Sequence, residues 1–375
     1  MSSIFGSDAS LLNVLKILKD KDHHSVRTLI LFDPPSEELT DLAAQTNVEI
    51  LSLTTEMSKL IEEGYEEMKD LSGDTENIFT ISYTSGTSGN PKGVMLTNGN
   101  FMSGIANILQ IANYFKLGPN DVYISYLPLA HVFDRLGCHA VISVGGQIGF
   151  FGGKILEITK DLILLKPTIF PSVPRLLNKV YDKVMAGVSE VNVIRRFLFY
   201  QGLVSKDHYN KKYGWTNNSF FDSLVFSRVK ERLGGRVRVM ITASAPIAPK
   251  VLAMLRCVFC CPIVEAYGQT ESCGASFGTK IFETQAGHVG GPGIGVEYKL
   301  KDLKELQYTR DSKPYPAGEV CLRGPSIFKG YFKNKKLTDE TKDSEGWIHT
   351  GDVGQIMPDK RLIIIDRVKN IFKLS

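Results

Sequence analysis

The chain has 375 residues, of which 43% are hydrophobic, and a formal net charge of +4. This length and hydrophobic content predict a large buried core in at least two domains or subdomains, and they exclude an intrinsically disordered protein. Because the net charge is small and basic residues are interspersed with acidic ones, bulk charge predicts no nucleic-acid partner. The basic runs at 329–336 and 367–373 are interpreted as solvated faces.

Six cysteines, together with the lack of a secretory signal pattern, indicate free thiols in an intracellular, reducing compartment. Cys257, Cys260 and Cys261 have no second Cys/His pair at ligand spacing, so they are predicted to be buried near a helix end. The uncharged stretch 136–153 is long enough to span a bilayer, but its glycines predict a helix, a turn and a strand instead. Any membrane anchor is therefore expected to be peripheral or outside this sequence.

Apolar residues near the start of the chain alternate between helical and strand spacing. The pattern predicts, in chain order, a helix at 10–18, a strand at 28–32, a helix at 37–46 and a strand at 48–51. This rhythm begins at a helix, as though earlier βα units were absent. Residues 55–72 are acidic and weakly patterned, which predicts a surface helix.

A strand at 79–83 is followed by a loop that is predicted to bind phosphate. The loop reads Thr84-Ser85-Gly86-Thr87-Ser88-Gly89-Asn90-Pro91-Lys92-Gly93, and no regular element is expected within it. Its glycines allow backbone N–H groups to turn inward, its hydroxyls add donors, and Lys92 adds a positive charge. The spacing differs from that of a Walker A loop, because Gly86 and Gly89 are too close and Pro91 precedes the lysine.

After this loop, Asn98 or Asn100 is predicted to cap a helix that reaches Phe115. The alternation then continues with strands at 122–127, 147–151, 168–170, 237–242 and 263–266, and helices from about 134, at 156–166, from 174 and at 249–258. Strands separated by helices predict an α/β fold with doubly wound, mostly parallel sheets. The shape of the polar, aromatic-rich insertion at 188–227 is not indicated by its sequence.

Beyond residue 288 the pattern changes to short apolar runs broken by turn residues, which predicts a small β-barrel-like subdomain. The predicted domains are an α/β core at 1–287, incomplete at its start, the β subdomain at 288–366, and a hinge at 367–375 that begins a missing C-terminal domain.

Four further motifs follow predicted strands, where α/β sheets bind ligands. They are Leu127–Arg135, Tyr267–Glu271, Trp347–Asp352 and Asp366–Asn370. From residue chemistry alone, Tyr267 is suited to stacking on a base and Glu271 to binding Mg²⁺ through oxygen. Asp352 is suited to accepting the hydroxyls of a ribose.

Taken together and in this order, these motifs resemble the acyl-adenylating (AMP-forming) superfamily, and within it the eukaryotic long-chain fatty-acid:CoA ligases. The resemblance covers nearly all of the chain from about Thr28 and includes 168–177 and 318–325. It implies ATP-dependent activation of a long-chain fatty acid to acyl-AMP and then acyl-CoA, with ATP, Mg²⁺ and CoA as cofactors or co-substrates. A carboxylic acid with a pKa near ~4.3 is already ionised at neutral pH, so a general base is not expected.

The resemblance also implies roles for particular residues. The implied catalytic residues are Lys92, Thr270, Glu271 and Arg367, and Glu271 and Thr84 are implied as Mg²⁺ ligands. The implied nucleotide-binding residues are Thr84, Ser85, Gly86, Thr87, Ser88, Gly89, Lys92, Tyr267, Gly268, Thr270, Asp352 and Arg367. The implied acyl-pocket residues are His131, Phe133, Arg135, Ala243, Ser244 and Ala245. Asp366 matches the hinge of the family.

Three residues depart from the family pattern. Ser88 stands where Thr is common, Val368 replaces a usual Lys, and Ala243 replaces a usual Gly, which places a Cβ where close approach or a positive φ is expected. Family members also extend further at both ends, which implies that this chain alone is weak or inactive.

Two alternative functions stay open. One is a non-catalytic short form that binds nucleotide or acyl chains, and the other is an adenylating enzyme for another carboxylic acid. The family implies peripheral or anchored association with the cytoplasmic face of the endoplasmic reticulum or another organelle membrane. Neither chain-length preference nor oligomeric state is predicted.

Overall fold

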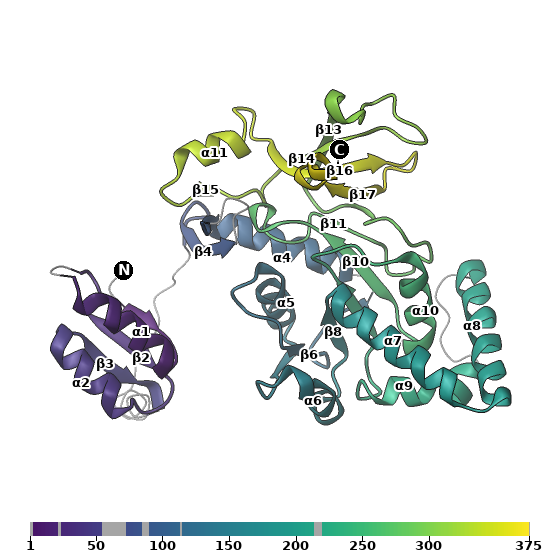
Figure 1. Ribbon diagram of the computed structural model, residues 1–375, viewed down its shortest axis with the longest axis horizontal. Helices are drawn as coiled ribbons and strands as arrows, with labels where there is room; N and C mark the ends of the chain where they lie inside the picture. Colours follow the sequence, from purple (N-terminus) through teal and green to yellow (C-terminus); the bar gives the residue numbers. More distant parts are fainter. Residues whose placement is uncertain are drawn as a thin grey trace. The chain divides into compact units, whose positions relative to one another are not determined.

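The computed structural model describes residues 3–21, 24–54, 73–84, 90–112, 115–213 and 220–374. Contacts divide the chain into two units, Met1–Ser72 and Gly73–Ser375, and each unit is described by itself (Figure 1). This division differs from the boundary expected near residue 288, which remains a prediction.

The first unit contains a three-stranded parallel sheet. Its strands are β1 (Ser3–Phe5), β2 (Thr28–Leu31) and β3 (Glu49–Ser52), in the order β1-β2-β3, and its helices are α1 (Asp8–Lys19) and α2 (Glu37–Thr46). Helix α2 begins where the Ser36 hydroxyl accepts a hydrogen bond from the Leu39 N–H, and it ends at Asn47 in the left-handed conformation. The helices predicted at 10–18 and 37–46 and the strands predicted at 28–32 and 48–51 are confirmed, whereas β1 was missed because three residues show no periodicity. The surface helix predicted at 55–72 lies outside the described residues.

The second unit is organised around a seven-stranded sheet of order β12-β11-β10-β9-β8-β6-β7. The parallel strands are β6 (Val122–Ser125), β7 (Gln147–Phe150), β8 (Ile169–Ser172), β9 (Val239–Thr242) and β10 (Ile263–Tyr267). Two short antiparallel strands, β11 (Phe277–Gly278) and β12 (Gly291–Pro292), complete one edge. The mostly parallel α/β sheet predicted from the sequence is confirmed.

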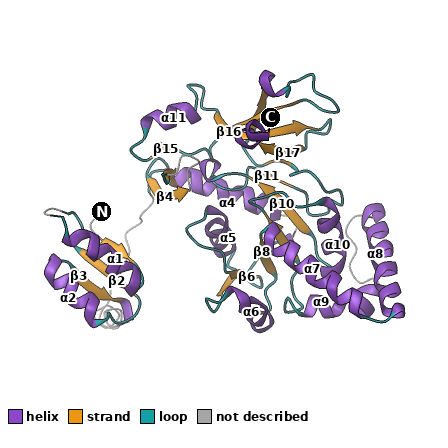
Figure 2. Ribbon diagram, viewed as in Figure 1, coloured by secondary structure: helices purple, strands orange, loops and turns teal. Residues whose placement is uncertain are grey.

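Both faces of this sheet are buried, which explains the nearly continuous apolar runs of its strands. Ile124, Phe170 and Met240 face one hydrophobic cluster, which contains side chains of α6, α7 and α10. Their neighbours along the strands, including Tyr123 and Ile169, face another cluster together with residues of α5. Figure 2 shows helices grouped beside the strands of this unit.

The helices of the second unit cover the sheet and extend from it. They are α4 (Asn98–Ala112), α5 (Val132–Ser143), α6 (Ile158–Leu165), α7 (Pro174–Glu190), α8 (Val193–Tyr213), α9 (Ser227–Glu231) and α10 (Pro249–Phe259). The described part of the 188–227 insertion is therefore helical. Helix α4 is capped by Thr97 instead of the predicted Asn98 or Asn100, because the Thr97 hydroxyl accepts from the Asn100 N–H and the Asn100 side chain accepts from the Thr97 N–H.

Two antiparallel sheets complete the second unit. The smaller contains β4 (Ile78–Thr84), β5 (Lys92–Thr97) and β15 (Gly330–Tyr331), with Thr84 paired to Lys92. The expectation that no regular element holds any residue of 84–93 is therefore wrong at both ends of that stretch, because a hairpin ladder extends to the loop. Residues 85–89 lie outside the described part of the chain.

The larger antiparallel sheet has the order β13-β14-β16-β17. Its strands are β13 (Glu297–Lys301), β14 (Ala317–Arg323), β16 (Ile348–Ile356) and β17 (Leu362–Arg367), and helices α11 (Lys335–Thr341) and α12 (Val368–Leu374) lie in the same part of the chain. The β character predicted beyond residue 288 is confirmed. Among the described strands this sheet is open, with β13 and β17 at its edges, rather than barrel-like.

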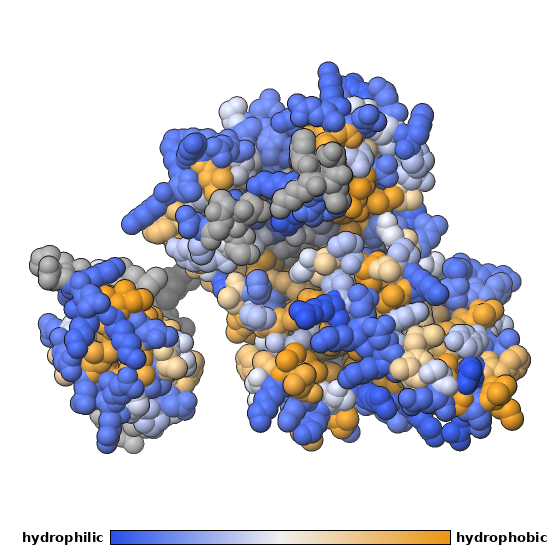
Figure 3. Space-filling model, viewed as in Figure 1, coloured by the Kyte–Doolittle hydropathy of each residue, from blue (hydrophilic) through white to orange (hydrophobic). Residues whose placement is uncertain are grey.

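Within the described residues, no helix combines the length and the apolar composition needed to cross a bilayer. The stretch 136–153 contributes instead to α5 and to β7. All six cysteines are buried and free, and Cys260 ends α10 in the left-handed conformation. Large apolar side chains such as Leu156 and Leu164 are exposed around α6, where Figure 3 shows hydrophobic surface.

Candidate active site

A cleft with a volume of about 1460 Å³ opens at the carboxyl ends of the parallel strands. Residues that end or follow β6, β8, β9 and β10 line one side of it. Residues of β14, β16, β17 and α11 line the other side, and the β4–β5 hairpin also contributes. Ligands of α/β sheets bind at this edge, because loops and side chains converge there without blocking one another.

Eleven of the residues singled out from the sequence line this one cleft. They are Thr84, Lys92, His131, Phe133, Ala243, Ser244, Tyr267, Gly268, Thr270, Glu271 and Arg367. Five of the predicted phosphate-binding residues lie outside the described residues: Ser85, Gly86, Thr87, Ser88 and Gly89. The fold thus brings together side chains from motifs that are far apart in the chain.

Tyr267 and Asp352 form the most extensively bonded group of the site. The Tyr267 hydroxyl donates to Asp352 Oδ2 over 2.8 Å, and Gln269 Nε2 donates to the same oxygen over 3.1 Å. Arg367 Nε lies 3.3 Å from Asp352 Oδ1. Burial raises the pKa of Asp352, while these donors and the Arg367 charge oppose that rise. Asp352 is therefore a buried carboxylate behind Tyr267 rather than a residue of the cleft wall.

Glu271 and Lys92 approach one another through Tyr331. The Tyr331 hydroxyl donates to Glu271 Oε1 over 2.7 Å, and Lys92 Nζ lies 5.5 Å from the centre of the Tyr331 ring. The backbone carbonyl of Glu271 accepts from the Phe328 N–H, which ties this motif to the segment before β15. A carboxylate, a phenol and an ammonium group thus share one end of the cleft.

Gly268 is required by close packing of the backbone. A Cβ at this position would lie 1.4 Å from the carbonyl oxygen of Gly274, so no other residue fits without moving the chain. The Tyr267–Glu271 turn is therefore shaped by the Gly274 backbone beneath it, and the side chains of Tyr267 and Thr270 are held at the cleft.

Three other predicted residues lie outside the lining of the cleft. Arg135 donates to the Leu129 carbonyl and to Thr80 Oγ1, and Ala245 is exposed to solvent. Asp366, near the end of β17, accepts from Asn370 Nδ2 over 2.9 Å at the start of α12.

Several residues that line the cleft were assigned no individual role from the sequence, among them Tyr331, Glu319 and His349. Tyr331 belongs to a two-residue strand within a stretch interpreted as a solvated basic face, so no local pattern marked it. Glu319 and His349 lie in the stretches 318–325 and Trp347–Asp352 that carried the family resemblance, but no role was assigned to either residue, because the sequence does not show that β14 pairs with β16.

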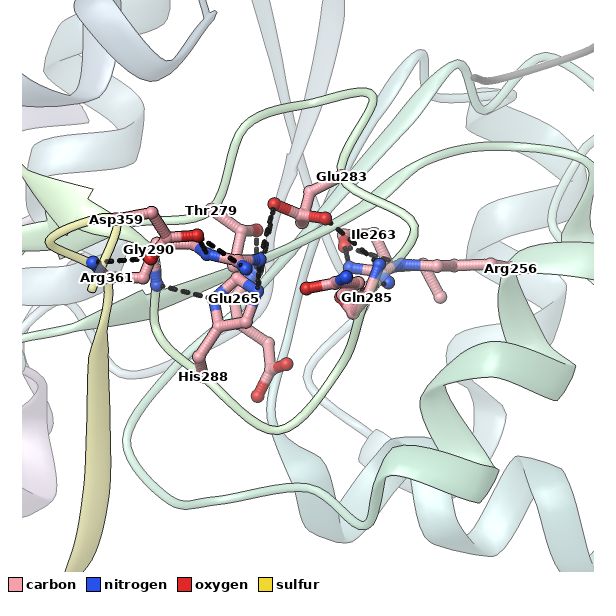
Figure 4. A network of polar contacts seen from close by, with 10 residues as sticks. All are labelled: Arg256, Ile263, Glu265, Thr279, Glu283, Gln285, His288, Gly290, Asp359 and Arg361. Carbon is pink, nitrogen blue, oxygen red and sulfur yellow. Dashed lines mark hydrogen bonds and ion pairs between the residues drawn. The ribbon is translucent and has the colours of Figure 1, made fainter. Parts of the chain in front are cut away.

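A polar network lies behind the sheet and joins α10 to the start of β17 (Figure 4). Arg256 donates to the carbonyls of Ile263 and Gln285. Arg361 Nη1 lies 3.1 Å from Glu283 Oε2 and 2.7 Å from His288 Nε2. Within the second unit, the α/β core and the antiparallel sheet are therefore connected by paired charges.

Glu265 lies beside this network on β10, two residues before Tyr267. Its side chain is buried, and Oε2 has no hydrogen-bond partner among the described residues. Burial raises the pKa of Glu265 to about 7, and Arg256 partly opposes this rise. The residue is thus a buried carboxyl group whose charge state changes near neutral pH.

The fold and the cleft define an α/β protein with a ligand site at the carboxyl edge of a mostly parallel sheet. A model of the family described as "AMP-binding enzyme" matches residues 3–332. The chain belongs to the AMP-binding enzyme family, as the resemblance predicted.

Curated relatives are similar over nearly the whole of this chain. It is 43% identical to the peroxisomal long chain acyl-CoA synthetase 7 of Arabidopsis thaliana over 94% of this chain and 49% of that protein. It is 42% identical to long-chain-fatty-acid–CoA ligase 5 of Rattus norvegicus over 93% of this chain and 50% of that protein. The chain therefore spans about half the length of the curated relatives it matches.

Solved structures share the fold. The A domain of the carboxylic acid reductase of Segniliparus rugosus, in complex with AMP and a co-purified carboxylic acid, aligns with a TM-score of 0.73 and 24% identity, covering 98% of this chain and 55% of that chain. The long-chain-fatty-acid-CoA ligase of Archaeoglobus fulgidus aligns with a TM-score of 0.64 and 21% identity, covering 95% and 65%. These similarities establish the α/β architecture of an adenylation domain.

Proposed function

We propose that this chain contains the nucleotide and acyl site of an enzyme that activates long-chain fatty acids with ATP. The observation that carries the proposal is the convergence of Lys92, Tyr267, Thr270, Glu271 and Arg367 on one cleft, in a chain 42–43% identical to long-chain acyl-CoA synthetases.

The proposed reaction has two steps. A carboxylate oxygen of the fatty acid attacks the α-phosphorus of ATP, the bond to the β-phosphate breaks, and pyrophosphate leaves. The sulfur of CoA then attacks the acyl carbon, its proton is lost, and AMP leaves. Because the acid is ionised at neutral pH, the first step requires charge neutralisation rather than a general base.

Lys92 and Thr84 are proposed to face the phosphates, because the β4–β5 ladder pairs these two residues on either side of residues 85–89 and both line the cleft. Thr84 and Glu271 both line the cleft and offer the oxygen donors that Mg²⁺ prefers. The ion, when bound, would neutralise part of the phosphate charge. Tyr331, which donates to Glu271, would hold that carboxylate in position.

Tyr267 is proposed to lie along the adenine and Arg367 at the ribose. Asp352, which was expected at the ribose, does not line the cleft, so we propose that it holds Tyr267 and Arg367 in position. The hydrogen bond from Tyr267 to Asp352 restricts the ring to one orientation, so little freedom would be lost when a base stacks on it. Arg367 ends β17 and lies beside the same carboxylate.

The acyl chain is proposed to follow the wall that contains His131, Phe133, Ala243 and Ser244. Ile108, Ile111 and Ile241 add apolar surface to the same cleft. Burial of each methylene group contributes ~0.8 kcal/mol, so an apolar wall of this kind would favour long chains over short ones. Because long-chain acids partition into membranes, we also propose that the enzyme associates peripherally with an organelle membrane, such as that of the endoplasmic reticulum or the peroxisome.

Binding of AMP, octyl-AMP and hexadecyl-AMP to the purified 375-residue chain tests this proposal. Affinity is expected to rise from AMP to the hexadecyl ester, and Lys92→Ala is expected to weaken ATP binding by ~10-fold or more through loss of a charged contact. Lys335→Ala is the matched control, because this exposed lysine pairs with Asp339 outside the cleft lining. Equal affinity for AMP and hexadecyl-AMP would contradict the proposal.

Exchange of labelled pyrophosphate into ATP separates catalysis from binding. Exchange that depends on palmitate more than on octanoate or benzoate supports a long-chain adenylating enzyme. Binding of hexadecyl-AMP without exchange favours the non-catalytic alternative, and exchange that is fastest with benzoate favours another acid.

A further inference from the structure

Three side chains with metal-binding atoms project together from two neighbouring strands of the antiparallel sheet. Cys321 of β14 is paired in register with His349 of β16. The register shifts between Glu319 and Cys321, and the Glu319 carboxylate also reaches His349 Nδ1, so the three ligand atoms come together.

The donor atoms lie at the separations that a tetrahedral ion requires. His349 Nδ1 is 3.6 Å from Cys321 Sγ and 3.1 Å from Glu319 Oε2, and the ligand atoms of all three residues lie within 4.8 Å of one another. Bonds of about 2.0 Å to nitrogen or oxygen and 2.3 Å to sulfur place the ligand atoms of a tetrahedral Zn²⁺ about 3.3–3.6 Å apart. The two distances from His349 Nδ1, 3.6 Å to Cys321 Sγ and 3.1 Å to Glu319 Oε2, are close to this range.

The arrangement does not suit a proton relay. In a thiol–imidazole–carboxylate relay the thiol and the carboxylate contact opposite ring nitrogens, so that the imidazole connects them. Here both Cys321 Sγ and Glu319 Oε2 approach Nδ1 of His349. Three electron-rich atoms that converge on one point are better satisfied by a cation.

Neighbouring groups hold this set in place and leave it accessible. The Gly351 N–H donates to Glu319 Oε1 over 3.1 Å, which leaves Oε2 directed at His349. Glu319 and His349 line the cleft, while Cys321 is buried behind them. Lys299 is paired with Cys321 on the neighbouring strand β13, and its ammonium group lies 4.3 Å from the centre of the Trp347 ring. The strand partner of Cys321 on β13 therefore has its charge on Trp347.

We propose that Glu319, Cys321 and His349 bind one zinc-class divalent cation, with a fourth coordination position facing the cleft. Binding forms a metal–sulfur bond and releases the Cys321 thiol proton to solvent. Thiolate and imidazole ligands select Zn²⁺ or Co²⁺ over Mg²⁺, so this site differs from the Mg²⁺ position proposed at Glu271 and Thr84. The proposal stands whether or not the chain forms acyl-adenylates.

Titration of the reduced 375-residue chain with Co²⁺, in excess Mg²⁺, tests this site. One equivalent is expected to produce a thiolate-to-cobalt absorption band in the near ultraviolet, and Zn²⁺ is expected to displace it. Cys321→Ser and His349→Asn are expected to weaken Co²⁺ binding by more than ~100-fold, since loss even of outer partners costs ~10- to 100-fold. Cys138→Ser is the matched control, because Cys138 is another buried free thiol, 4.0 Å from the Asp134 carboxylate.

Thermal unfolding without metal shows whether each variant folds. If Cys321→Ser does not fold, His349→Asn and the protection of Cys321 from alkylation by Zn²⁺ in the unaltered chain decide the matter. The proposal is overturned if the absorption band is absent, if Zn²⁺ leaves Cys321 alkylation unchanged, or if Cys138→Ser loses the band while Cys321→Ser keeps it.

Discussion

At the residue scale, backbone strain in the cleft occurs at Ser244. Ala243 was expected to need the positive φ that the family's usual glycine allows, but the positive angle, φ 80°, belongs to Ser244. A non-glycine residue in this region costs of order 1–3 kcal/mol, and such residues concentrate at functional sites. The strain therefore falls on a residue that lines the cleft rather than on the one that departs from the family pattern.

Ser244→Gly is expected to increase the free energy of unfolding by about 1 kcal/mol, because glycine adopts a positive φ without a Cβ clash. Ala245→Gly is the control, since Ala245 is exposed and has no positive φ, and a loss of about 0.4–1 kcal/mol is expected there. Urea unfolding of both variants measures the difference. A Ser244→Gly variant that is less stable than the unaltered chain would show that the serine hydroxyl outweighs the strain.

At the scale of single elements, the start of α4 shows how one residue pair determines a helix boundary. Thr97 and Asn100 satisfy each other's backbone N–H groups, and Asn100 Nδ2 also donates to the carbonyls of Pro325 and Ile327. The same residues thus end β5, begin α4 and bind the segment that precedes β15.

Thr97→Ala is expected to lower the free energy of unfolding by about 1 kcal/mol through loss of the cap. Thr159→Ala, at an exposed position within α6, is the control and is expected to change it by less than about 0.5 kcal/mol. Chemical denaturation measures both. Equal effects of the two substitutions would mean that the cap contributes nothing beyond helix propensity.

At the scale of the whole molecule, Glu265 and His288 make stability depend on pH in opposite senses. The folded-state pKa of Glu265, about 7, is above its ordinary value of 4.5. The contribution of protonated Glu265 to the free energy of unfolding is therefore complete below pH 4.5. It is lost as the pH rises through 7, a change on the order of 3 kcal/mol. Glu265→Gln is expected to remove this loss, so that the free energy of unfolding no longer falls as the pH rises from 5 to 8. Glu305→Gln, at an exposed carboxylate, should leave the profile unchanged.

His288 is expected to lower the free energy of unfolding at acidic pH. Burial, followed by the nearby Arg361 charge, lowers its pKa in the folded chain, and Glu283 partly opposes this. The Gly290 N–H approaches Nδ1 and Arg361 Nη1 approaches Nε2. The neutral ring can accept from one of these donors, whereas a doubly protonated ring can accept from neither. The contribution of neutral His288 to the free energy of unfolding is present above the pKa of ~6.5 that histidine has in the unfolded chain. It is lost as the pH falls through the lower pKa of His288 in the folded chain.

His288→Gln is therefore expected to remove the loss of stability on acidification. Below about pH 6.5 the two groups oppose one another, so each single variant should expose the effect of the other. Urea unfolding at half-unit pH intervals tests this. A His288→Gln variant that loses as much stability at pH 5 as the unaltered chain would exclude the assignment.

The sequence by itself determined the α/β class, most elements of the parallel sheet, the family, and the cleft residues Tyr267, Thr270 and Glu271. These are local properties: the period of apolar residues selects helix or strand, and each of these motifs directly follows a strand. Element boundaries were less well predicted where strand pairing, and not the local residue pattern, decides the end of a strand, as in the extension of β4 and β5 to Thr84 and Lys92.

Only the tertiary structure decided which distant side chains meet. Tyr267 contacts Asp352 across 85 residues and Glu271 contacts Tyr331 across 60, while Cys321 faces His349 through the register of β14 and β16. Register depends on turns, bulges and the packing of whole sheets, and a shift of β14 by one residue would move Cys321 away from His349 to the other face of the sheet. No local pattern contains that information, so the composition of the cleft follows from the fold as a whole.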